Sequence, residues 1–127
     1  MRSYSALLVL LAFGCADETP PRFDQDLPEC PEESILTYEN FGRPFLLSWC
    51  TGCHSSELTN AQRGDSPEDL SFDDPNMFRP YLLEMYDVAA DDNIEMPPVG
   101  GPGLDERRLF GEWLACGAPS DHDVFPE

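Results

Sequence analysis

The sequence predicts an all-α fold, and three observations support that class. Three stretches between residues 38 and 114 place large apolar side chains three and four positions apart, which is the spacing of one helical face. The strict apolar–polar alternation of a half-buried strand is nearly absent. Proline and glycine lie between the stretches, where they act as boundaries and stop signals.

The first predicted helix covers residues 38–49. Its apolar face consists of Tyr38, Phe41, Gly42, Phe45, Leu46 and Trp49. Pro44 lies off this face. Because proline lacks an amide hydrogen, we expect it to kink the helix or to mark where its second half begins.

The second predicted helix has Asp74 as its N-cap and Pro75 in its first turn, and Pro80 implies a bend. Its apolar face consists of Met77, Phe78, Tyr81, Leu82, Met85 and Val88. The third begins near Asp105 as a possible N-cap and stops before Gly117 and Pro119. Its face consists of Leu109, Phe110, Trp113 and Leu114. Residues 97–103, rich in proline and glycine, predict a loop before it.

The first 14 residues predict a removable export signal. Arg2 precedes a short apolar run, which falls well below the roughly 20 residues needed to span a bilayer. The run ends in Gly14-Cys15, which resembles the lipobox of bacterial lipoproteins. That resemblance implies that Cys15 is acylated and becomes the first residue of the mature chain. An ordinary signal cut elsewhere is the alternative.

The remaining chain divides by composition. Residues 15–33 are rich in proline and acidic residues and predict a disordered, lipidated tether. The folded domain is predicted over residues 34–120, and residues 121–127 form an acidic tail. The formal net charge is −18, which argues against nucleic acid and anionic lipid headgroups as partners. Such a surface favours a partner with a basic docking patch, or it serves solubility alone.

The chemistry is concentrated in Cys50-Thr51-Gly52-Cys53-His54. Two cysteines three positions apart and an adjoining histidine are the attachment signature for a covalent haem c. The thiols lie one helical turn apart, and each can form a thioether to one haem vinyl group. A thioredoxin-like redox pair is an alternative, but it prefers a βαβ context. Half of a zinc site is another, but the only other histidine is His122.

These residues, together with Met96-Pro97, resemble the small monohaem c-type cytochromes of class I. In that family a methionine followed by proline binds the iron opposite the histidine. The resemblance therefore implies a helical domain around one haem, with His54 and Met96 as axial ligands. His122 or an open position is the alternative for the sixth site, while Met77 and Met85 fit a helical core.

The resemblance extends to both ends of the predicted domain. Gly42 and Leu46 precede Cys50 by eight and four residues, and Phe110, Trp113 and Leu114 match the family's terminal helix. In the family these two helices cross closely at the glycine. Residues 55–76 match no recognised pattern.

Five cysteines occur in the chain. One is assigned to the lipid and two to haem, so Cys30 and Cys116 remain. An even remainder in an exported protein predicts a disulfide between them, with two free thiols as the alternative. For Arg107 and Arg108 we expect surface ion pairs, and for the Asp73-Asp74 and Asp91-Asp92 pairs solvated loops and helix caps rather than calcium ligands.

The resemblance implies a single-electron carrier, not an enzyme, lipid-anchored in the bacterial cell envelope and facing the periplasm, with redox proteins as partners. The alternatives are a haem-based sensor of small ligands, an electron-accepting subunit of a periplasmic oxidoreductase complex, and a thiol–disulfide oxidoreductase.

Overall fold

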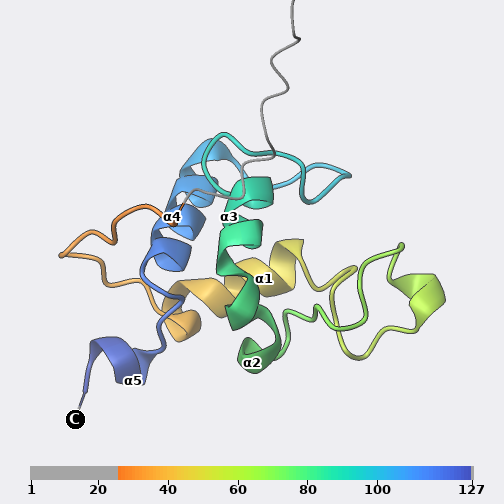
Figure 1. The fold of residues 1–127 in the computed structure, drawn as a ribbon, viewed down its shortest axis with the longest axis horizontal. Coiled ribbons are helices and arrows are strands. Elements are labelled where there is room, and N and C mark those ends of the chain that lie inside the picture. The colour runs from red at the N-terminus through yellow and green to blue at the C-terminus, as the bar shows by residue number, and fades with distance from the viewer. Residues whose placement is uncertain (1–25, 127) are drawn as a thin grey trace, which may run out of the picture.

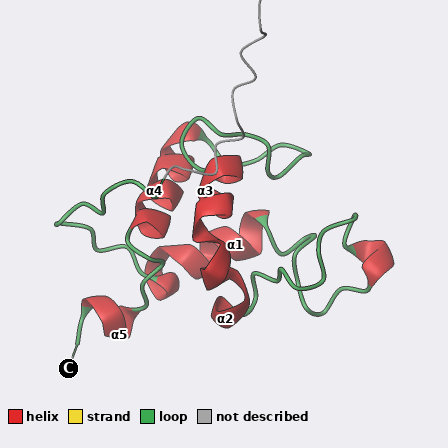
Figure 2. Cartoon of the chain, viewed as in Figure 1, coloured by secondary structure: helices red, strands yellow, loops and turns green. Residues whose placement is uncertain are grey.

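The computed structural model describes residues 26–126, and in that part of the chain the regular elements are all helical (Figure 2). In chain order these are η1 (Tyr38–Gly42), α1 (Arg43–Trp49), η2 (Asn60–Gln62), α2 (Pro75–Phe78), η3 (Arg79–Tyr81), α3 (Leu82–Ala89), α4 (Leu104–Ala115) and α5 (Asp121–Val124). The predicted all-α class is therefore confirmed for these residues. None of their helices has the length and apolar character that crossing a membrane requires.

The first predicted helix is divided at its proline. Thr37 caps η1, a π-helical turn, through a bond from the Asn40 amide to its hydroxyl. Pro44 then lies in the first turn of α1, where the helix does not require an amide hydrogen from it. The proline thus marks the start of the second half of the helix, which is one of the two predicted outcomes.

The second predicted helix bends where expected. The Asp74 side chain accepts a hydrogen bond of 2.9 Å from the Asn76 amide and caps α2. Pro80 lies in η3, the tighter turn that joins α2 to α3. The third helix, α4, begins earlier than predicted, because Gly103 is its N-cap and Asp105 lies in its first turn. There the negative charge of Asp105 complements the helix dipole. Gly117, with φ of +83°, follows the end of α4.

The core lies where α3, α4 and the η1–α1 segment meet. Helices α3 and α4 lie side by side (Figure 1), and η1 packs against α4. Trp113, Phe78 and Phe110 are the largest fully buried side chains. The rings of Phe45 and Phe110 stack with their centroids 4.2 Å apart. Residues 55–73, including η2, extend to one side of these helices (Figure 1).

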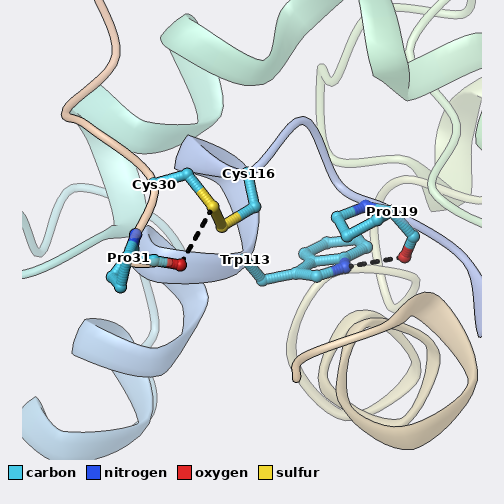
Figure 3. Close-up of a disulfide and its surroundings, with 5 residues drawn as sticks. All are labelled: Cys30, Pro31, Trp113, Cys116 and Pro119. Carbon is cyan, nitrogen blue, oxygen red and sulfur yellow. Dashed lines mark hydrogen bonds between the residues drawn. A yellow bond between two sulfur atoms is a disulfide. The ribbon is translucent and has the colours of Figure 1, made fainter. Parts of the chain in front are cut away.

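The predicted disulfide is confirmed. Cys30 and Cys116 are bonded, with their Cα atoms 4.7 Å apart (Figure 3). Trp113, three residues before Cys116, extends its indole toward Pro119, and its Nε1 donates to the Pro119 carbonyl. Residues 26–33 contain no helix or strand. The bond therefore fixes the end of the predicted tether to the C-terminal end of α4. The predicted signal at 1–14, the lipidation of Cys15 and residues 16–25 lie outside the described residues.

The fold continues beyond the predicted boundary at residue 120. Residues 121–124 of the predicted acidic tail form α5, which packs against η1. The Thr37 hydroxyl donates to Asp121 Oδ1 over 2.5 Å, and the Asp121 amide donates to Glu39 Oε2 over 2.7 Å. These polar bonds join the start of α5 to η1 and to its N-cap.

Candidate functional site

The cysteine–histidine motif forms a turn that continues α1. The Cys50 amide donates to Leu46 O, and the amides of Cys53 and His54 donate to Cys50 O over 3.2 and 2.9 Å. Both cysteines are free thiols. The Cys50 thiol is desolvated, and this burial raises its pKa to about 12. Cys53 is exposed.

The ring of His54 is held from two sides. Its Nδ1 lies 3.3 Å from the Leu70 carbonyl oxygen, and its centroid lies 4.8 Å from that of Phe72. A carbonyl only accepts, so Nδ1 must carry the hydrogen in this bond. Burial lowers the pKa of His54, opposed by the bond to Leu70 and assisted by the charge of Arg63. The favoured species is therefore neutral imidazole, with the lone pair on Nε2.

Met96 lies in the loop between α3 and α4. Its amide donates to Val88 O over 2.9 Å, which attaches the middle of the loop to α3. Arg107 holds both ends, because its Nε donates to Asp91 O and its Nη1 to Pro102 O, each over 2.7 Å. The expectation that Arg107 forms a surface ion pair is therefore wrong, because its guanidinium binds backbone carbonyls instead. Arg108 does form one, with Asp105 at 3.7 Å.

One cavity of about 350 Å³ brings the predicted site residues together. Cys50, Cys53, His54 and Met96 all line it. Apolar side chains supply most of the remaining wall: Phe45, Trp49, Leu70, Phe72, Met85, Val88, Ala89 and Phe110. The only charged residues that line it are Asp65 and Glu84. Volume and lining both fit a cofactor site, for which about 300–1,000 Å³ and a mainly apolar wall are usual.

A second methionine also reaches this cavity. Met85 lines it from α3 and is 4% exposed, whereas Met96 is 43% exposed. Met85 also belongs to the hydrophobic core, as its helical spacing predicted. His122 lies in α5, away from the cavity lining. Among residues 26–126, no three or more His, Cys, Asp or Glu side chains gather as a metal-binding group.

Sequence reasoning missed the groups that position His54. The Leu70 carbonyl accepts from the ring, and Arg63 donates to the same oxygen over 2.8 Å. The sequence does not reveal a backbone oxygen as an acceptor, and a single arginine in a segment without a recognised motif does not stand out.

Comparison of the chain with family models, with curated proteins and with solved structures finds no match.

Proposed function

We propose that this chain is a c-type cytochrome that carries one covalent haem and transfers single electrons. The observation that carries the proposal is the shared cavity. One apolar space of about 350 Å³ is lined by all four residues that the sequence singles out, which span 47 positions of the chain: Cys50, Cys53, His54 and Met96. Each residue type suits its assigned part: two thiols for thioether bonds, and one nitrogen and one sulfur for axial ligation.

The residues around the cavity prepare His54 for metal binding. Metal-bound histidines usually donate their other ring hydrogen to a carbonyl or carboxylate, which fixes tautomer and orientation. His54 donates from Nδ1 to Leu70 O and retains its lone pair on Nε2. Phe72 packs against the same ring, and its amide donates to His54 O over 2.8 Å. The ligand is therefore oriented by both its ring and its backbone.

The assignment of Met96 follows from its loop. Arg107 and Val88 hold the loop at its ends and its middle, so the thioether is kept near the cavity at low entropic cost. When bound, haem supplies an iron that alternates between ferrous and ferric states, and His/Met ligation raises its potential. Phe45, Phe110 and Trp49 give the cavity an apolar wall, which would limit the access of water to the haem.

The rival uses of the motif are less well supported. A thiol–disulfide oxidoreductase needs a nucleophilic thiolate, with a lowered pKa. Burial instead raises the pKa of the Cys50 thiol to about 12, which disfavours a thiolate at that position. A haem-based sensor remains the second candidate, because Met96 is 43% exposed on a loop and a small ligand would compete with it for the iron.

The test is a pyridine haemochrome measurement on protein produced with a cytochrome c maturation system. We expect one haem per chain, lost in the Cys50→Ser Cys53→Ser variant. Correctly exported protein without pigment would contradict the proposal. A matched methionine pair then identifies the sixth ligand: Met96→Leu should abolish the methionine–iron charge-transfer band of the ferric protein, and Met85→Leu should preserve it. A high-spin ferric wild type that readily binds carbon monoxide when reduced supports the sensor.

The cellular setting is part of the same proposal. We place the domain at the bacterial envelope, facing the periplasm and attached by lipid on Cys15, with electron-transfer partners that present basic patches to this acidic chain. Fractionation tests the anchor: the wild type should remain with membranes, and Cys15→Ser should be released. Salt should weaken partner binding, because exposed charges are screened. A soluble wild type would contradict the anchor while leaving the haem assignment intact.

A further inference from the structure

Arg63 is a buried cation whose partners are neutral. It follows η2 and is 3% exposed, and neither ion pair found within residues 26–126 includes it. Its guanidinium instead donates to backbone carbonyls and one hydroxyl: Ser55 O at 2.5 Å, Pro67 O at 2.5 Å, Leu70 O at 2.8 Å, Ser71 Oγ at 3.4 Å and Ser66 O at 3.5 Å. A buried charge is costly unless it is fully hydrogen-bonded, so this arrangement needs a reason.

The carbonyls that Arg63 selects lie on both sides of His54. Nη1 donates to Ser55 O, which belongs to the residue directly after His54. Nη2 donates to Leu70 O, the acceptor of the His54 ring hydrogen. One rigid guanidinium therefore connects the backbone beside the histidine to the oxygen that orients its ring. The planar fork of arginine suits this task, which a flexible, compact ammonium serves less well.

The Leu70 carbonyl oxygen can accept from Arg63 and His54 together. A carbonyl oxygen has two lone pairs and accepts both donors at once. The Arg63 bond, at 2.8 Å, is shorter than the His54 bond, at 3.3 Å. The stronger, charge-assisted bond therefore holds the oxygen, and the histidine bond uses the position so fixed. Without Arg63, the carbonyls of Pro67 and Leu70 also lose the donor that keeps this segment folded toward His54.

We propose that Arg63 is a positioning residue for the haem ligand: by binding Ser55 O and Leu70 O together, it holds the Leu70 carbonyl against the His54 ring and so fixes the tautomer and orientation of the imidazole. This inference rests on the proposed function, because it assigns His54 to the iron. It adds a residue outside the cysteine–histidine motif and outside the cavity lining to the ligand's support.

The test compares three variants of the haem-loaded protein by NMR. Arg63→Gln should accelerate solvent exchange of the His54 Nδ1 hydrogen at least tenfold and shift the paramagnetically displaced ring signals of His54. Arg63→Lys should give a smaller change. Gln62→Ala is the matched control, since Gln62 directly precedes Arg63 and its Oε1 accepts from the Thr59 amide and hydroxyl, away from Leu70 and the cavity lining. It should lower stability and leave the ring signals unchanged.

The outcomes separate the two proposals. If wild type carries no covalent haem, the proposed function fails and this inference with it. If wild type carries haem but Arg63→Gln resembles Gln62→Ala in the ring signals, only the inference is overturned. A further measurement covers variants that fail to mature: in the wild type, both His54 Nδ1 and the Arg63 guanidinium nitrogen should show hydrogen-bond scalar coupling to the Leu70 carbonyl carbon. Absence of either coupling overturns the inference.

Discussion

The indole ring of Trp113 lies against the Cα atom of Gly42, so that a Cβ atom at position 42 would be 2.6 Å from Cε2 and Cη2 of the ring. Gly42 ends η1, and Trp113 is a fully buried residue of α4. Their contact therefore sets how closely the first and last helical segments of the domain approach. Only glycine permits this approach, because any other residue places a carbon where the ring lies.

Gly42→Ala should therefore destabilise the protein. Overpacking costs about 1–3 kcal/mol, and the better helix propensity of alanine offsets up to about 1 kcal/mol. The rigid, buried indole cannot yield easily, so we expect a net loss on the order of 1–2 kcal/mol in urea unfolding. Gly52→Ala is the control, since nothing lies within 4 Å of its Cβ position. Equal stability of the two variants would contradict the packing argument.

Much of the architecture was predictable from local signals. Helical spacing predicted the buried apolar faces except for Leu109, which was expected on the face of the third helix but is 41% exposed. Pro44 and Pro80 predicted the two divisions, and Gly117 predicted the end of α4. These features can be recognised in the sequence because each depends on the local backbone or on the spacing of nearby residues, not on distant contacts. The resemblance to cytochromes also singled out Gly42, whose contact with Trp113 the structure contains.

The rest depended on contacts between distant segments. Thr37 and Asp121 are 84 positions apart, and no sequence pattern around either residue predicted that α5 would pack beside η1. Arg107 binds two backbone carbonyls across its loop rather than a carboxylate, and its charge alone does not indicate which kind of partner it has. At the candidate site, side chains with distinctive chemistry were identifiable, but the backbone oxygen of Leu70 and the arginine that holds it were not.

Removing the disulfide should destabilise the domain strongly. Cys30 and Cys116 are 86 positions apart, and closing a loop of about this length contributes roughly 4–5 kcal/mol in the loop-entropy model. We expect the Cys30→Ser Cys116→Ser variant to lose about 2–5 kcal/mol, measured by thermal and urea unfolding. Reduction of the wild type should produce the same shift. A change below about 0.5 kcal/mol would show that residues 26–33 contribute little to the folded state.

Arg107→Gln should loosen the Met96 loop selectively. The variant loses the bonds to Asp91 O and Pro102 O, each of which contributes about 0.5–1.5 kcal/mol. We expect faster amide exchange in residues 92–101. If Met96 binds the haem iron as proposed, added imidazole should also displace it more easily. Arg108→Gln removes the same charge from an exposed ion pair and should leave both unchanged. Similar behaviour of the two variants would indicate an effect of charge, not of loop fixation.

Asp73 should make stability depend on pH in acid. Burial raises the pKa of its carboxyl, but bonds from Ser55 and Ser56 outweigh that effect and hold the pKa below its ordinary 3.8. Ser55 Oγ donates over 2.6 Å and the Ser56 amide over 2.9 Å, so the carboxylate fixes the two residues that follow His54. A lowered folded-state pKa means that the ionised form stabilises the fold at pH values above 3.8. That contribution disappears as pH falls through the folded-state pKa.

Asp73→Asn should therefore be less stable than wild type near neutral pH, and the difference should shrink steadily as pH falls below about 3.8. Urea unfolding at a series of pH values measures this convergence. Asp92→Asn removes an equal charge from an exposed position in the loop after α3, so it corrects for the general effect of charge on this acidic chain. A stability difference between wild type and Asp73→Asn that stays constant down to pH 2 would mean that the carboxylate form of Asp73 does not hold the segment after His54.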